Sequence, residues 1–342
     1  MTESYDALLL LSFGGPEGPD DVMPFLRNVV RGRGVPDERL ATVAEHYHHF
    51  GGVSPINGQN RELLAAIRAD FAANGLELPV YWGNRNWNPY LADTLRQMRE
   101  DGIRRTLVFV TSAYCSYSSC QQYKEDLAKA HAEIGPGGPE TVVLRRFFNH
   151  PGFIEPHVDA VRGAYASLLP ARRAKARLVF TAHSIPSRMD AQAGPGGHLY
   201  SRQLREAARL VAEEAAPNAQ WDLVWQSRSG PPHVPWLEPD VNDHLQAIVA
   251  DGVTDVVISP IGFVSDHLEV LWDLDNEAKD TAYKLGLGFA RAATPGVDRR
   301  FVEMVRELVL ERTSGSEPRA LGTFGAGPDA CTESCTVALL GR

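Results

Sequence analysis

The chain has 342 residues, of which 44% are apolar and 23% are charged, and its formal net charge is −9. This length exceeds what one hydrophobic core normally serves, so we expect two domains of ordinary size. The acidic balance and the lack of a dense Lys/Arg run argue against nucleic acid as a partner. We expect a cytoplasmic protein, because no apolar stretch reaches the length of a membrane span and no signal-peptide pattern is present.

Short apolar runs alternate with amphipathic stretches along the chain. The apolar runs predict strands over residues 5–13, 78–84, 105–113, 141–147, 176–184, 221–227 and 254–263. Apolar residues at three- and four-residue spacing predict helices over residues 19–30, 60–75, 90–102, 121–135, 157–169, 199–216, 240–252 and 300–313. Such alternation is typical of parallel sheets covered by helices.

The predicted elements divide into two comparable sets. "DGIRRTLVFVTSAY", from residue 101, resembles "DGVTDVVISPIGF", from residue 251, in its order of helix end, Asp-Gly, apolar strand and polar loop. This repeat predicts two similar α/β domains with functional groups at the carboxyl ends of their strands. We expect domains over residues 1–165 and 166–320, followed by a cysteine-bearing tail over 321–342.

Several loops that follow predicted strands could bind ligands. "SFGGPEG" is not Gly-x-Gly-x-x-Gly and contains a proline, so it does not favour a nucleotide site. "GGVSPINGQ" leads into a helix, and helix starts and Ser hydroxyls bind carboxylates as readily as phosphates. "YWGNRNWNP" and "VWQSRSGPPHVPWLEPD" place Arg85 and Arg228 among aromatic residues. The aromatic and arginine side chains of these two segments either pack in the hydrophobic core and at its edge or together form a site for a large, flat aromatic ligand.

His183 stands at the end of a strong predicted strand in "FTAHSIPSRM". An imidazole at an exposed strand end titrates near neutral pH and suits general-base catalysis. On this motif alone a hydrogen-bonded structural histidine is the favoured interpretation, because most histidines are not catalytic.

A row of carboxylates follows the last predicted strand in "SDHLEVLWDLDNE". On an α-helix Glu269, Asp273 and Glu277 would lie along one side, since the outer two would be offset by only about 80°. Asp266 is placed to cap the start of that helix. The row is either a solvated face or a set of carboxylates that raise one another's pKa and attract a divalent cation.

The four cysteines form two spaced pairs, Cys115 with Cys120 and Cys331 with Cys335. In a cytosolic chain such pairs favour metal or iron–sulfur ligation over disulfides. Four unrelated thiols are the alternative interpretation.

These motifs together resemble the ferrochelatases. "FTAHSIP", "WQSRSG…PWLEP" and "SPIGFVSDHLEVLWDLDNE" carry the resemblance, with "SFGGP", "GGVSPI" and "GNRNWNP" in the first half. They occur in the family's order over most of the chain. The resemblance implies two Rossmann-like domains with a cleft between them and insertion of Fe²⁺ into a porphyrin. "YSSC" and the cysteine-bearing tail are similar to the [2Fe-2S]-containing, actinobacterial-type members, which are associated with the coproporphyrin route to haem.

The resemblance also implies roles for individual residues. His183 matches the active-site histidine and Glu269 its facing carboxylate, and both would contact the metal. Asp273 and Glu277 would continue the metal path. Phe13, Ser54, Arg85 and Trp236 match porphyrin-lining positions. Arg31 and Tyr123 are further residues that we expect to bind the porphyrin.

This sequence departs from its relatives at four places. Asp273 stands where a longer Glu is common. Phe13 stands where other members have a Tyr, so no phenolate ligand is available there. His46 stands where some coproporphyrin-using members have an Arg for a propionate, which leaves Arg31 and Arg33 as nearby candidates. Related tails often hold three cluster ligands, whereas this tail holds two, so Cys115 would complete a set of four with Cys120, Cys331 and Cys335.

The expected substrate is coproporphyrin III with ferrous iron, and protoporphyrin IX is the alternative porphyrin. A cobalt chelatase and a non-catalytic haem- or iron–sulfur-binding regulator are the remaining hypotheses. We expect a monomer that makes at most transient contacts with other enzymes of haem synthesis.

Overall fold

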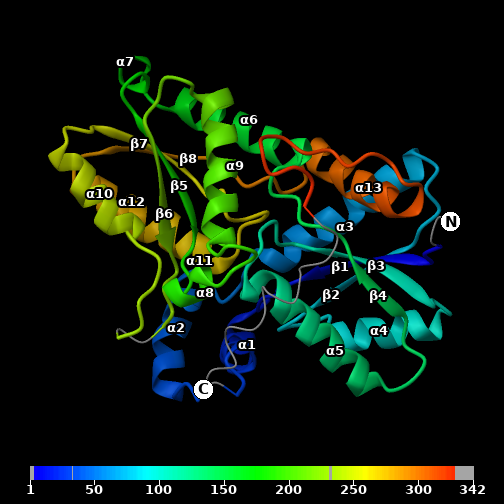
Figure 1. Ribbon diagram of the computed structural model, residues 1–342. Coiled ribbons are helices and arrows are strands. Elements are labelled where there is room, and N and C mark those ends of the chain that lie inside the picture. The colour runs from blue at the N-terminus through cyan, green and yellow to red at the C-terminus, as the bar shows by residue number, and fades with distance from the viewer. Residues whose placement is uncertain (1–3, 33, 231–232, 328–342) are drawn as a thin grey trace.

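The computed structural model describes residues 4–32, 34–230 and 233–327. It contains two parallel four-stranded sheets, with strand orders β2-β1-β3-β4 and β6-β5-β7-β8 (Figure 1). The strands are β1 (Ala7–Ser12), β2 (Val80–Asn84), β3 (Arg105–Val110), β4 (Glu140–Val143), β5 (Arg177–His183), β6 (Trp221–Gln226), β7 (Asp255–Ser259) and β8 (Gly288–Arg291). The predicted α/β fold with two similar Rossmann-like halves is confirmed, because both sheets have the same strand order.

Helices cover both sheets. In the first half these are η1 (Pro19–Asp21), α1 (Val22–Val29), α2 (Asp37–His49), α3 (Ile56–Ala73), α4 (Leu91–Glu100), η2 (Tyr117–Gln121) and α5 (Gln122–Ile134). The remaining helices are α6 (Pro151–Ser167), α7 (Pro170–Arg173), α8 (Ser187–Ala191), α9 (Leu199–Ala215), α10 (Val241–Ala250), α11 (Leu268–Val270), η3 (Leu271–Ala278), α12 (Lys279–Lys284) and α13 (Arg299–Thr313).

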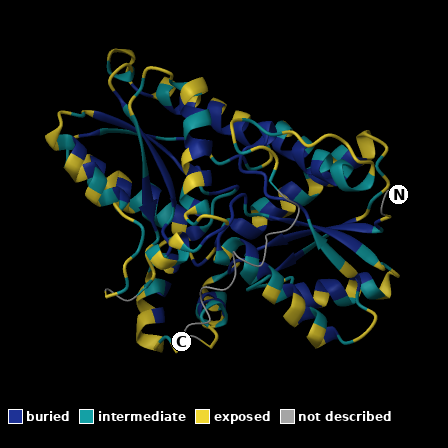
Figure 2. Cartoon of the chain, viewed as in Figure 1, coloured by how far each residue is buried: buried dark blue, intermediate teal, exposed yellow. Residues whose placement is uncertain are grey.

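The central strands are buried on both faces. In β1 every residue of "ALLLLS" is buried, and alternate leucines face two different core clusters. Continuous apolar runs of this kind are typical of parallel strands between two helical layers. Figure 2 shows the central strands as mostly buried and the outer faces of α4, α5, α10 and α12 as exposed.

The sequence repeat has a structural counterpart. Asp-Gly follows both α4 and α10, and Gly102 and Gly252 have φ angles of 80° and 82°. The residue after each glycine donates its N–H back to the helix, Ile103 to Met98 and Val253 to Ile248. Glycine adopts this left-handed conformation at little cost, so both helices end sharply and lead into β3 and β7.

Each half also has a π-helix after its third strand. η2 follows β3 and holds Cys120, and η3 follows β7 and holds Asp273 and Glu277. Such helices are rare and are frequent at functional sites. The α-helix predicted for the carboxylate row is therefore wrong over residues 271–278.

Long helices pack the two halves together. α13 packs against α6 and also against α3, where Arg306 and Asp70 form an ion pair of 2.7 Å. Residue 165, where the sequence divides into two sets, lies inside α6. The division into domains at that residue stays a prediction.

The carboxyl ends of both sheets meet beside α1, α2, α8 and α11 (Figure 1). Gln59 on α3 accepts a hydrogen bond of 2.9 Å from the backbone of Asp266, which precedes α11. Leu268 of α11 packs in one apolar cluster with residues of α1 and α2. The parts of the chain expected to carry function are thus brought together.

Across the described ranges no helix has the length and apolar character needed to cross a bilayer. Cytoplasmic location and a monomeric state stay predictions.

Candidate active site

His183 is the last residue of β5, paired in register with Gln226 of β6. Its Nδ1 lies 2.5 Å from the Ser184 carbonyl oxygen, which can only accept a hydrogen bond. Nδ1 therefore carries the proton in the neutral ring, and Nε2 keeps its lone pair. Nε2 lies 3.8 Å from Oε2 of Glu269, so the predicted pair is brought together.

Both members of this pair are reachable from solvent. The side chains of His183 and Glu269 are 35% and 47% exposed. The Tyr200 hydroxyl donates to the His183 carbonyl oxygen at 2.9 Å and fixes the end of the strand. The pair can therefore exchange protons or a metal ion with an incoming molecule without a rearrangement of the core.

Asp273 occupies a different environment from Glu269. Its Oδ2 accepts hydrogen bonds from the Ser227 hydroxyl and from Nε2 of Gln226, the latter at 3.3 Å. Burial raises the pKa of Asp273 to about 7, and the charges of Glu269 and Glu277 act in the same direction. The two hydrogen bonds oppose this shift. Asp273 thus changes its charge near neutral pH.

Glu277 is exposed and accepts a hydrogen bond of 2.9 Å from the indole N–H of Trp272. The three carboxylates of the row therefore differ in their partners. Within the described ranges no group of three or more His, Cys, Asp or Glu side chains is arranged to hold a metal ion. The structure brings His183 and Glu269 together but does not gather all four predicted metal ligands into one cage.

The helix cap predicted at Asp266 is wrong. His267 precedes α11 instead, and its side chain makes no capping hydrogen bond. The Asp266 carboxylate pairs with Arg291 of β8, and its backbone N–H is bound by Gln59. β8 was not predicted from the sequence, so the arginine partner could not be foreseen.

Three of the predicted porphyrin residues of the first half lie near one another. The Arg85 guanidinium lies 5.8 Å from the ring centre of Phe13 and 4.4 Å from that of Tyr123, and it pairs with Asp126. Its side chain is only 6% exposed, and Tyr123 is buried in the core. Arg85 thus packs between the rings of Tyr123 and Phe13. Direct contact of Arg85 or Tyr123 with a ligand stays a prediction.

Ser54 is buried beside the loop that follows β1. Its N–H donates to the Pro16 carbonyl oxygen at 2.9 Å. A Cβ at Gly15 would lie 2.7 Å from that of Ser54, so this glycine permits close packing of two loops. The "SFGGP" motif therefore serves loop packing here.

Trp236 lies in the second half against the loop that follows His183. It forms an antiparallel bridge with Pro186, and Leu237 donates its N–H to Ile185 at 3.0 Å. The buried indole N–H of Trp236 has no hydrogen-bond partner among the described residues. Among the predicted porphyrin residues, Trp236 is bridged to the loop that directly follows His183.

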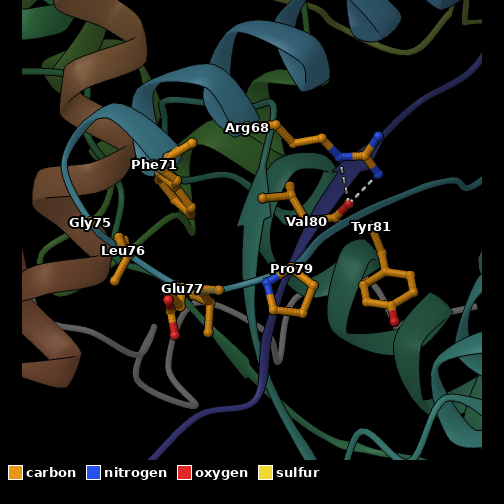
Figure 3. Close-up of a pocket in the computed structure, with 10 residues that line it drawn as sticks. Arg68, Phe71, Gly75, Leu76, Glu77, Pro79, Val80 and Tyr81 are labelled. Carbon is orange, nitrogen blue, oxygen red and sulfur yellow. Dashed lines mark hydrogen bonds between the residues drawn. The ribbon is translucent and has the colours of Figure 1, made fainter.

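Arg31 is exposed and lines a cavity of about 480 Å³ together with Arg85, Tyr90 and Lys129. Arg33 lies outside the described residues. A larger cavity, of about 790 Å³, lies beside Leu76 and Pro79 near the start of β2, where Arg68 binds the Val80 carbonyl oxygen (Figure 3). Neither cavity is lined by His183 or Glu269.

Comparison with known proteins decides the family. The ferrochelatase family model matches residues 5–313. The chain belongs to the ferrochelatase family. It is an enzyme of that family. The structure places His183 and Glu269 3.8 Å apart, and their catalytic roles stay predictions.

Similar proteins cover nearly the whole chain. It is 56% identical over 338 residues to the coproporphyrin III ferrochelatase of Nocardia farcinica, covering 96% of each. It is 57% identical to those of Mycolicibacterium smegmatis, covering 95% of this chain and 94% of the relative, and Streptomyces coelicolor, covering 97% and 93%. Among solved structures, SirB from Bacillus subtilis with Fe³⁺ has a TM-score of 0.56 at 13% identity, covering 92% of this chain and 97% of that one. This last likeness supports the fold alone.

Two cysteines of this ferrochelatase lie in the described part of the chain. Cys115 precedes η2 and Cys120 lies within it, and both are buried. Cys331 and Cys335 lie outside the described residues. The backbone N–H of Cys115 donates to Gln203 of α9 at 2.8 Å.

Sequence reasoning missed the groups that support the site. Gln226, Ser227 and Tyr200 bind Asp273 or the end of β5, and none was assigned a role. Gln226 and Ser227 lie in the quoted "WQSRSG" motif, so their place after a strand was the available signal. Their pairing with Asp273 depends on how β6 lies against η3, which the sequence alone does not specify.

Proposed function

We propose that this ferrochelatase inserts Fe²⁺ into coproporphyrin III, with His183 and Glu269 facing the centre of the ring. The observation that carries the proposal is the 3.8 Å separation of His183 Nε2 and Glu269 Oε2 at the exposed carboxyl edge of the second sheet. The names of the similar proteins, coproporphyrin III ferrochelatases at 56–57% identity, support the choice of porphyrin.

Insertion releases two N–H protons from the porphyrin as Fe²⁺ enters, and the iron keeps its oxidation state. We assign acceptance of a proton to His183, because Nε2 keeps its lone pair while Nδ1 donates to a carbonyl. The carboxylate of Glu269, 3.8 Å away, stabilises the imidazolium that forms. The second proton leaves by the same exposed pair after the first has passed to solvent.

The carboxylate row serves exchange of iron and protons with solvent. Glu277 is exposed at the outer end, and Asp273, with a pKa of about 7, accepts or releases a proton at neutral pH. Oxygen ligands that do not form a closed cage bind Fe²⁺ weakly, so the ion can move on to the porphyrin.

The ring itself would be held by aromatic and cationic groups from both halves. Phe13 presents its ring from the end of β1, and Trp236 stands beside the histidine loop. Arg31 is an exposed cation at the end of α1, suited to one of the four propionates of coproporphyrin III. Binding energy from these remote contacts can bend the ring and expose a nitrogen lone pair.

The test is anaerobic Fe²⁺ insertion run in parallel on coproporphyrin III and protoporphyrin IX. We expect a higher kcat/KM for coproporphyrin III. A higher value for protoporphyrin IX would keep the chemistry and contradict the choice of substrate. Insertion into neither porphyrin would overturn the proposal.

We further propose that Cys115, Cys120, Cys331 and Cys335 hold a [2Fe-2S] cluster. The two described thiols fit such a group, because both are buried and lie five residues apart in the chain. Cys120 lies in η2, and Cys115 lies in the segment just before it. The described end of the tail approaches the same helix: Thr323 donates its N–H to Glu206 of α9, one turn from Gln203, which binds Cys115. The cluster would join the tail to η2, and iron insertion needs no electron from it.

The cluster is tested on anaerobically purified protein by visible absorbance and by iron and sulfide content. We expect both signals in the wild type and their loss in Cys120→Ser. Their absence from the wild type would overturn the proposal. Their persistence in Cys115→Ser would remove that residue from the ligand set.

A further inference from the structure

Trp272 connects the two halves of the molecule beside the carboxylate row. It is the second residue of η3, and its indole stacks on the imidazole of His46 from α2, with ring centres 3.9 Å apart and planes within 7°. His49 packs its ring edge-on at 5.5 Å, and Phe50 does so at 6.4 Å. The indole is therefore held from the first half of the chain while its backbone belongs to the second.

The same indole binds the outer carboxylate of the row. Nε1 of Trp272 donates to Oε1 of Glu277 at 2.9 Å. These residues are five apart, and on an α-helix they would lie about 140° from each other around the axis. The i→i+5 pattern of a π-helix brings residues five apart to successive turns, so η3 permits this contact.

We propose that Trp272 is a positioning residue for iron capture: it holds Glu277 at the outer end of the row by a hydrogen bond and takes its own orientation from the stack on His46. This inference rests on the proposed role of Glu277 in passing iron inward. Glu277 is exposed, and without the indole N–H its carboxylate would rotate among several rotamers. Among the described residues Trp272 forms no hydrogen bond with His183 or Glu269, so the chemical step should change little.

His46 gains a function from this arrangement. Where relatives were expected to bind a propionate with an arginine, the imidazole here lies flat on Trp272. A flat ring supplies the stacking surface that keeps the indole plane fixed.

The first experiment compares Trp272→Phe with the wild type. Phenylalanine keeps a ring against His46 but has no N–H, so only the bond to Glu277 is removed. We expect KM for Fe²⁺ to rise about five- to tenfold, as for the loss of one ordinary hydrogen bond at a solvent-exposed group, while kcat and KM for the porphyrin change less than about twofold. An unchanged KM for Fe²⁺ would overturn the inference.

Trp221→Phe is the matched control. Trp221 packs against Phe180 at 5.8 Å and lies at the start of β6, at the opposite end of that strand from Gln226. The same chemical change there should leave KM for Fe²⁺ unaltered. A rise equal to that of Trp272→Phe would show a general effect of losing an indole and would overturn the inference.

A double-mutant cycle separates this inference from the proposed function. If Glu277→Gln leaves KM for Fe²⁺ unchanged, the role of Glu277 fails. If Glu277→Gln raises KM and Trp272→Phe does not, the positioning role alone fails. We expect both single variants to raise KM and the double variant to add little more, because they remove one interaction.

The stack is tested at His46. We expect His46→Ala to raise KM for Fe²⁺ and to change the near-ultraviolet circular dichroism of the indole, and His46→Phe to restore both. Failure of His46→Phe to restore KM, with wild-type thermal stability retained, would contradict the role of stacking.

Discussion

The two halves of this ferrochelatase have the same frame and different groups at the same positions. Ser12 is the last residue of β1, which pairs with β2 and β3. His183 is the last residue of β5, which pairs with β6 and β7 in the same way. Ser12 is buried and accepts a hydrogen bond from Thr111 at 3.0 Å. His183 is partly exposed and faces Glu269. One strand end is structural, and the other presents a side chain at the exposed edge of its sheet.

The second strand of each half repeats the contrast. β2 ends in Asn84, which binds Asn57 and the Asn88 carbonyl in a buried network of neutral amides. β6 ends in Gln226, whose amide binds the carboxylate of Asp273. A neutral network holds loops together, whereas the carboxylate changes charge near neutral pH.

The π-helices complete the comparison. η2 carries a buried thiol in the first half, and η3 carries carboxylates in the second. The shared strand order puts side chains at equivalent positions in both halves, and the residue type at each position sets the chemistry. We infer that the first half mainly binds and the second half mainly reacts, and the following experiments could break or sharpen that division.

The largest effect is expected at the equivalent strand ends. His183→Ala should lower kcat about 10²- to 10⁴-fold, the usual contribution of a general base. Ser12→Ala removes a buried hydrogen bond and should cost about 1 kcal/mol of stability with kcat nearly unchanged. Turnover and urea unfolding of both variants decide the matter, and near-wild-type turnover of His183→Ala would break the comparison.

A change of pH dependence is expected next, at Ser227. Its hydroxyl stabilises the ionised form of Asp273 and so opposes the rise in pKa. Ser227→Ala should raise the pKa of Asp273 above about 7, and the acid limb of the rate profile should move up by roughly one pH unit. An acid limb at the wild-type position would separate Asp273 from the rate.

A smaller effect is expected in the first half at Asp126. Asp126 holds the guanidinium of Arg85 beside Phe13. Asp126→Asn should raise KM for the porphyrin a few-fold and leave kcat intact. Arg85 would be held less firmly beside Phe13, whereas His183 and Glu269 would be unchanged. Lowered kcat with unchanged KM would place this region in the chemical step.

The last prediction concerns stability rather than rate, so it has the smallest expected effect on turnover. The pKa of Asp273 is about 7 in the folded chain against 3.8 for a free group. Between pH 4 and 7 the unfolded chain loses this proton and the folded chain keeps it, so folding becomes less favourable by at most about 1.4 kcal/mol per pH unit. Asp273→Asn should therefore gain stability relative to the wild type as pH rises, and level off above pH 7. Urea unfolding of both proteins at pH 5 and 8 measures the difference, and an equal difference at both pH values would contradict the shift.

Much of this architecture could be predicted from the sequence, because the strong strands are continuous apolar runs and the repeated Asp-Gly marks corresponding helix ends. α2 was missed, since its run "DERLATVAEHYHH" has only a weak apolar stripe, and β8 is four residues long. The π-helix could not be foreseen, because residues spaced i and i+4 suit an α-helix equally well. The positions of His183 and Glu269 followed from motifs, but the contacts of Trp272 and Asp273 depend on packing between segments far apart in the chain.

The division of roles is tested most directly by one paired measurement on Phe13→Ala and Glu269→Gln. Affinity for coproporphyrin III and saturated anaerobic turnover would be measured for each. We predict weaker porphyrin binding with nearly normal saturated turnover for Phe13→Ala, and normal binding with turnover lost for Glu269→Gln. Lost turnover at normal affinity in Phe13→Ala, or retained turnover in Glu269→Gln, would contradict the account.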